Sequence, residues 1–120
     1  LFLFFDCSKN AHLGNLETLT VTLGTGVSLA SWGSLNAYKI GRLMIVVGVG
    51  VKFASASGTL CTISGVKASR YFAGTGYVEG SNSKVFFVTM SASGNANEVK
   101  FEGVANLNNN GYFEFTVFVD

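Results

Sequence analysis

Side chains that could do acid–base chemistry are few in this sequence, and their spacing favours structural or surface roles over catalysis. The one histidine, His12, has Asp6 as its acidic neighbour, but no GxSxG elbow is present to hold a nucleophile. Glu98 and Glu102 would lie on one strand face with their backbones about 13 Å apart, further than the roughly 5–9.5 Å between the carboxylates of glycoside hydrolases. The sequence therefore predicts no catalytic residue and no enzyme.

Two further patterns leave alternatives open. Glu79 and Glu114 could converge in a folded chain, so a glycan hydrolase that uses one of them is the enzymatic alternative. The stretch "GTGYVEG" (74–80) has the glycines of a phosphate loop but lacks the βαβ context that such a loop needs. We interpret it as a strand with two glycines, against which a neighbouring chain or a large side chain packs.

Metal and cofactor sites are not predicted. Asp6, Cys7 and His12 are the nearest cluster of ligand types, and their spacing matches no standard site. Cys7 and Cys61 likewise fit no CxxC or zinc pattern. Two unpaired thiols are favoured, with a disulfide between them as the alternative, and Cys61 reads as a small buried hydrophobe.

A binding surface is the remaining kind of site. Trp32, in "LASWGSL", is the single tryptophan and is either a core residue or a stacking platform for sugar or protein. The same alternatives apply to Tyr71, Tyr77 and Tyr112. The tip "NLNNNG" (106–111) reads as a plain turn, although its amides also suit carbohydrate hydroxyls. The candidate receptor-binding residues are Trp32, Tyr71, Asn82, Asn108, Asn109 and Asn110.

The elements that must position these residues fit one domain of 120 residues. Charged residues make up only 12%, against about 25% in a typical domain, so the surface is neutral and polar or is covered by partners. The net charge of +1 provides no electrostatic footprint for nucleic acid. The first residues, "LFLFFDCSKN", favour a strand or an oligomer contact over the tail of a signal peptide.

The segment Leu43–Phe53 is the most apolar stretch of the chain. Arg42 and Lys52 bound it, so it is too short for a membrane-spanning helix, which needs about 20 apolar residues. Its valines and interior glycines favour a long central strand. We expect its odd-numbered residues, from Leu43 to Phe53, to face the core. The even-numbered face carries Gly48 and Gly50, which indicates close approach of another surface.

Other segments alternate or are apolar throughout. "TLTVTL" and "EVKFEG" place apolar residues on one face and Thr, Glu or Lys on the other, which also argues against a membrane β-barrel and for no membrane insertion. "KVFFVTM" and "YFEFTVFV" read as buried strands. Turn clusters separate about eight strands at intervals of 8–12 residues, which is typical of an antiparallel sandwich or barrel.

The order of pieces from residue 36 to 119 resembles a known family. "KIGRLM" (39–44) corresponds to a "kxGnlV" pattern, "TLCTISGVKAS" (59–69) to "t-L-P-x-G-y-R-P", and "GYFEFTVFV" (111–119) to a closing aromatic strand. These pieces are similar to the C-terminal head domain of bacteriophage tail-fibre and receptor-binding proteins. The usual prolines are replaced by Ser64 and Ser69, the arginine by Lys67 and the final tyrosine by Phe118.

The resemblance implies an all-β, antiparallel, jelly-roll-like β-sandwich that forms a homotrimer on a tail fibre or another exposed surface of a virion. Residues 1–35 would be a stem-like segment with the first strands and residues 36–120 the head, together one domain. It also implies a non-enzymatic protein without cofactors, whose partners are other virion proteins and a host-surface glycan or protein. The alternatives are a virion structural module, such as a capsid decoration or baseplate protein, and a free-standing carbohydrate-binding domain.

Overall fold

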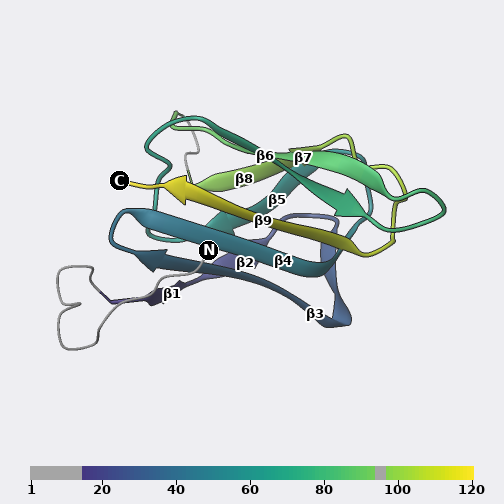
Figure 1. The fold of residues 1–120 in the computed structure, drawn as a ribbon, viewed down its shortest axis with the longest axis horizontal. Coiled ribbons are helices and arrows are strands. Elements are labelled where there is room, and N and C mark those ends of the chain that lie inside the picture. The colour runs from purple at the N-terminus through teal and green to yellow at the C-terminus, as the bar shows by residue number, and fades with distance from the viewer. Residues whose placement is uncertain (1–14, 94–96) are drawn as a thin grey trace.

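Nine antiparallel strands form one sheet in the computed structural model, which describes residues 15–93 and 97–120 (Figure 1). The strands are β1 (Glu17–Leu19), β2 (Val21–Leu23), β3 (Val27–Ile40), β4 (Leu43–Phe53), β5 (Gly58–Ile63), β6 (Phe72–Val78), β7 (Lys84–Met90), β8 (Glu98–Glu102) and β9 (Gly111–Phe118). Their order in the sheet is β1-β3-β4-β9-β6-β7-β8-β5-β2. The prediction of an all-β antiparallel protein is confirmed, with nine strands instead of about eight.

The sheet rolls up nearly into a barrel because one stretch of chain reaches both of its edges. β1 pairs with the end of β3, and β2, which follows after Thr20 alone, pairs with β5. The amide of Ser64 donates to the carbonyl of Thr20 at the changeover. β1 covers Ala37–Lys39 of β3 and β2 covers Cys61–Ile63 of β5, so each edge of the sheet ends in a strand of three residues, and such short edge strands limit edge-to-edge aggregation.

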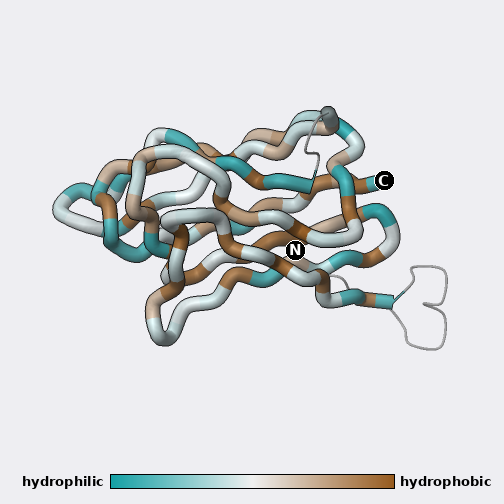
Figure 2. Tube along the Cα trace, turned by 180° about the vertical axis from the view of Figure 1, so that it is seen from behind, coloured by the Kyte–Doolittle hydropathy of each residue, from teal (hydrophilic) through white to brown (hydrophobic). Residues whose placement is uncertain are grey.

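The core lies inside the rolled sheet and is rich in aromatic rings. Phe53 is fully buried, and its ring centroid lies 5.1 Å from that of Phe86 and 4.5 Å from that of Phe101. Among the described residues no polar or charged side chain is buried. Figure 2 shows hydrophobic residues recurring along the strands, separated by pale and hydrophilic ones. Burial of apolar area at roughly 25 cal/mol per Å² is therefore the main stabilising term.

The predicted inward face of β4 is wrong over most of its length. Met44 and Val46 point inward, whereas the odd-numbered residues up to Val49 are half-buried on the outer face. Gly50 has a φ of +66°, and the register with β9 shifts between Val49 and Val51. This bulge inserts one residue, so Val51 and the rest of the strand face inward on the opposite parity. Simple alternation fails here because the strand changes phase halfway.

The glycines of β4 and β6 make room for rings of the same chain. A Cβ at Gly48 would lie 2.4 Å from the ring of Phe113, and one at Gly76 would lie 2.7 Å from the ring of Phe86 and 2.8 Å from the Cβ of Phe113. Gly48, Phe113 and Gly76 lie opposite one another on β4, β9 and β6. The surface predicted to approach these glycines closely is thus a set of aromatic rings of the same chain. For residues 74–80 the two alternatives were a neighbouring chain and a large side chain, and the structure shows the large side chain.

The other strand predictions are mostly confirmed. Val99 and Phe101 face inward, and Lys100 and Glu102 face outward. β7 and β9 are exceptions, because Phe87 is 50% exposed and Phe118 is 59% exposed on their outer faces, although both segments read as buried strands. Cys61 is a buried free thiol in β5, and burial raises its pKa to about 12. Asp6, Cys7, His12 and the "LFLFF" run lie outside the described residues.

Candidate binding site

Trp32 stands on an irregular excursion in the middle of β3. Leu29 pairs with Val51 of β4 and Ser34 pairs with Val49, so four residues of β3 lie opposite the single residue Gly50. Such irregularities re-aim side chains and recur beside functional sites. Here the excursion turns the indole outward, where Trp32 is 56% exposed. Of the two interpretations of this tryptophan, the core residue is wrong, and the stacking platform stays a prediction.

Close packing of backbone holds the excursion against β4. A Cβ on Gly33 would lie 2.8 Å from the carbonyl oxygens of both Val49 and Gly50, so only glycine fits there. A Cβ on Gly50 would lie 2.8 Å from the indole of Trp32. Because both residues lack a Cβ, the indole packs directly against β4.

Three aromatic rings form a row across three strands, which we call the aromatic ridge: Trp32 of β3, Tyr112 of β9 and Tyr77 of β6. The ring centroids of Trp32 and Tyr112 lie 6.3 Å apart with an angle of 23° between the planes. Those of Tyr77 and Tyr112, which are cross-strand partners, lie 5.2 Å apart at 25°. Rings stacked in this way order one another and offer flat apolar faces to a ligand.

A carboxylate fixes the end of the ridge that lies towards the loops. The hydroxyl of Tyr112 donates to Glu79 Oε1 at 3.3 Å, and the amide of Asn110 donates to the same oxygen at 2.8 Å. The pKa of Tyr112 lies above its ordinary value, first because burial disfavours the phenolate and then because the charge and hydrogen bond of Glu79 favour the neutral phenol. Tyr112 is therefore a neutral donor whose ring is held in one orientation.

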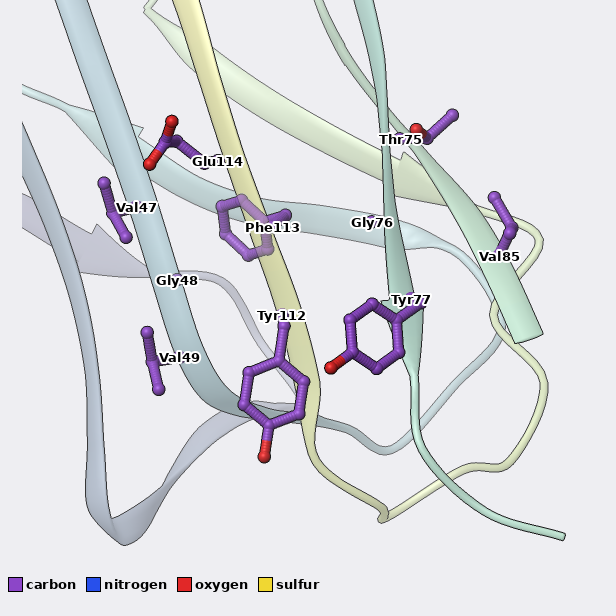
Figure 3. A pocket seen from close by; sticks show the side chains of 10 residues that line it. All are labelled: Val47, Gly48, Val49, Thr75, Gly76, Tyr77, Val85, Tyr112, Phe113 and Glu114. Atoms are coloured by element: carbon purple, nitrogen blue, oxygen red, sulfur yellow. The ribbon is translucent and has the colours of Figure 1, made fainter. Parts of the chain in front are cut away.

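Beside the ridge, a shallow hollow of about 520 Å³ crosses the outer face of the sheet (Figure 3). We call it the cross-strand groove. It is lined by Val47, Gly48, Val49, Thr75, Gly76, Tyr77, Val85, Tyr112, Phe113 and Glu114. Tyr77 and Tyr112 form one wall, and the polar groups of Thr75 and Glu114 come from neighbouring strands. Its size lies within the range of small-molecule pockets, and its lining is mainly apolar with a few polar groups, as such pockets usually are.

The predicted asparagines gather at the same end of the barrel as the ridge, which is the end where β6 ends and β9 begins (Figure 1). Asn106 ties two loops together there, with its amide 3.5 Å from the carbonyl of Val78 and 3.3 Å from that of Asn82. The amide of Asn109 donates to the carbonyl of Asn106, and Asn108 has a φ of +65°. The side-chain amides of Asn106 and Asn109 thus stabilise the turns themselves, while a receptor-binding role for the predicted asparagines stays a prediction.

Tyr71 lies at the other end of the barrel. It directly precedes β6, whose first residue, Phe72, packs against Phe115 with ring centroids 4.9 Å apart. Ala68 bridges to Val119 beside the C-terminus. Residues 80–84 and 106–111 thus lie at the end of the barrel that carries the ridge, and residues 67–72 lie at the other end.

Sequence reasoning missed Glu79 as a partner of the ridge and left Tyr77 and Tyr112 as ambiguous aromatics. Their positions in the strands carried a usable signal, because each tyrosine alternates with residues that face inward. The partnership with Glu79 could not be read, since it joins residues 31 and 33 positions apart. On the outer face of β8, Nζ of Lys100 lies 3.5 Å from Oε1 of Glu98.

Within residues 15–93 and 97–120, no group of His, Cys, Asp and Glu side chains is placed to hold a metal ion. The same residues include no helix long and apolar enough to cross a membrane.

Comparison with known proteins yields a likeness of fold. No protein-family model and no curated protein matches the sequence. The solved head domain of the lactococcal phage bIL170, described in connection with the receptor-binding domains of lactococcal phages, is 17% identical and superimposes with a TM-score of 0.65. The match covers 88% of this chain and 100% of that one. The chain therefore has the fold of a lactococcal phage head domain.

Proposed function

We propose that this protein is a non-enzymatic receptor-binding head, carried on an exposed surface of a phage virion, that attaches to a host-surface glycan. The observation that carries the proposal is the excursion of β3, which interrupts a long strand to place Trp32 over Tyr112 at the surface. The likeness of fold to a phage head domain supports the same function.

The chemistry of the ridge suits a sugar. The C–H faces of a pyranose ring are apolar and stack on indole and phenol rings, while its hydroxyls both donate and accept hydrogen bonds. Trp32 and Tyr77 offer exposed ring faces, and the hydroxyl of Thr75 lies in the lining of the groove. We propose that one glycosyl unit lies along the ridge and presents its hydroxyls to the groove.

The test is binding of the purified protein to host cells and to their extracted surface polysaccharide, with Trp32→Ala as the variant. We expect affinity to fall at least about tenfold while the melting temperature stays nearly unchanged, because the indole is mostly outside the core. The matched control is Phe87→Ala, which also removes a half-exposed ring, from a position outside the groove. Equal binding by Trp32→Ala and the unaltered protein would overturn the proposal.

A second candidate is a virion structural module that binds another virion protein. The apolar lining of the groove favours it, because Val47, Val49 and Val85 resemble the centre of a protein interface more than a sugar site. In that case Val85→Lys would abolish binding to a purified virion protein, and no host polysaccharide would bind. Saccharide binding that depends on Trp32 decides against this candidate.

We also propose the homotrimer that the sequence resemblance implies. At the end of the barrel away from the ridge, Leu43, Ile45, Tyr38 and Phe118 lie side by side on the outer faces of β3, β4 and β9. We call this surface the Leu43–Phe118 strip. Phe118 is 59% exposed although it is a large apolar residue, so a second copy of the chain that covers the strip would remove that cost. The ridge would then stay open at the opposite end.

A further inference from the structure

A second hollow, of about 470 Å³, lies on the outer face of β5, β7 and β8 and shares no lining residue with the cross-strand groove. Three of its residues form a straight row across the sheet, since Lys100 is the cross-strand partner of both Thr59 and Thr89. Ser57 and Glu102 add a hydroxyl and a carboxylate to the lining. The hollow is thus lined mainly by hydrogen-bonding groups.

Tyr71 supplies the one large exposed ring of this hollow. It is 64% exposed and lines the hollow from the loop before β6. The partner of Thr89 on β6 is Ala73, which has a short side chain. An aromatic wall next to a row of hydroxyl and charged groups can stack on one face of a ligand and bind its edge.

The charges select the class of ligand. Lys100 lies between Glu98 and Glu102 on one strand, and its ammonium group is already 3.5 Å from Glu98. Glu102 forms no ion pair with any residue that the structure describes. A phosphate or sulfate would meet two carboxylates for one ammonium group, so an anion is disfavoured. A neutral polyol meets donors in Lys100 and the threonines and an acceptor in Glu102.

We propose that this Tyr71 hollow is a second saccharide site, which takes one neutral glycosyl unit stacked on Tyr71 with its hydroxyls bonded to Lys100, Glu102 and Thr89. The proposal shares its ligand class with the proposed function but concerns other residues. Two sites at different places on one head would let a repeating polysaccharide engage the protein twice, which raises avidity without any new contact.

The experiment is a titration of the isotope-labelled protein with neutral monosaccharides (glucose, galactose, rhamnose and N-acetylglucosamine), followed by backbone amide shifts. We expect at least one sugar to shift the amides of Thr59, Thr89 and Lys100 saturably in the millimolar range. Tyr71→Ala should weaken this response at least about tenfold. Tyr71→Phe should restore it, because the ring is kept.

Trp32→Ala separates the two proposals. It should leave the response of Thr89 and Lys100 within about twofold of the unaltered protein, since the ridge and the hollow share no residue. If Trp32→Ala loses binding at the ridge and keeps the response in the hollow, the result supports two separate sites. Shifts confined to the ridge, or a response in the hollow that Tyr71→Ala does not change, would overturn the second site and leave the first standing. No saturable shift near Tyr71 with any of the four sugars would overturn it as well.

Discussion

Tyr112 joins the two halves of the candidate site. Its ring stacks on Trp32 on one side and on Tyr77 on the other, and its hydroxyl donates to Glu79. A phenol held by both stacking and a hydrogen bond to a charged group loses little further freedom when a ligand binds. The ridge is therefore preorganised by this one residue, although the exposed Trp32 is expected to contribute more contact area.

Titration of Tyr112 tests this arrangement. Its pKa in the folded protein lies above the ordinary 10.0, chiefly through burial and then through Glu79. The folded state holds the proton more tightly than the unfolded chain does, so the stabilisation is complete below pH 10 and is lost as the pH rises through the folded pKa. The difference in phenolate absorbance between the unaltered protein and Tyr112→Phe should show a midpoint above 10.0. Glu79→Gln should lower the midpoint only in part, because burial remains; an unchanged midpoint would contradict the contact.

At the scale of the element, the phase change of β4 and the excursion of β3 are one feature. Gly50 is the extra residue on β4, and it lies opposite the four residues of β3 that carry Trp32. The left-handed backbone at Gly50 is what lets β4 change face while its neighbours on both sides stay paired. The local geometry that displays the tryptophan thus depends on a glycine in another strand.

Gly50→Ala tests that dependence. A side chain at a φ of +66° is strained, and its Cβ would lie 2.8 Å from the indole, so we expect a loss of about 1–3 kcal/mol in the free energy of unfolding. The indole should also move, which a shift in tryptophan fluorescence would report. Unchanged stability and emission would show that the excursion does not depend on this position.

The contact of Gly48 with Phe113 allows a sharper test. Gly48→Ala should destabilise the protein by about 1–3 kcal/mol, because the new Cβ would lie 2.4 Å from the ring of Phe113, which would have to move. Phe113→Leu removes the overlapping ring. Chemical denaturation of the two single variants and the double variant should therefore show strong coupling, with Gly48→Ala costing much less in the Phe113→Leu background. Additive losses would place the origin of the cost in the backbone instead.

These elements also show what the sequence could and could not predict. The strands were recognisable because Val, Phe and Tyr recur between clusters of Gly, Asn and Ser, and "EVKFEG" has the alternation of a strand with one face in solvent. The inward face of β4 was predicted wrongly because one glycine bulge reverses the parity. Trp32 could be named from its rarity, but its exposure depends on the pairing of β3 with β4. That pairing is a property of the whole sheet, and it cannot be predicted from the local pattern of apolar and polar residues.

At the scale of the whole molecule, the outer surface divides into regions of different character. The aromatic ridge lies at one end of the barrel, the Leu43–Phe118 strip lies at the other end of the same strands, and the Tyr71 hollow lies further round the sheet. With only 12% charged residues, copies of the protein repel one another weakly, so charge does little to prevent association through exposed apolar surface at high concentration. The proposed assembly through the strip would cover that surface and would leave both proposed saccharide sites accessible.

The native mass measured by light scattering at two concentrations tests this assembly. We expect a mass near three chains that persists on dilution, because the proposed interface is apolar. Phe118→Lys should shift the mass to that of one folded chain, since it places a charge in the proposed interface at a site that is 59% exposed in the single chain and so tolerates lysine. Phe87→Lys is the matched control, at a phenylalanine that is 50% exposed on β7, outside the strip, and it should leave the mass unchanged.

If the unaltered protein is a clean monomer, the strip is not a contact between copies, and an exposed Phe118 would need a different partner, such as another virion protein. If both lysine variants dissociate the trimer, the interface extends over β7, and the cross-strand groove beside it would then be covered by a neighbouring chain and not open to a glycan.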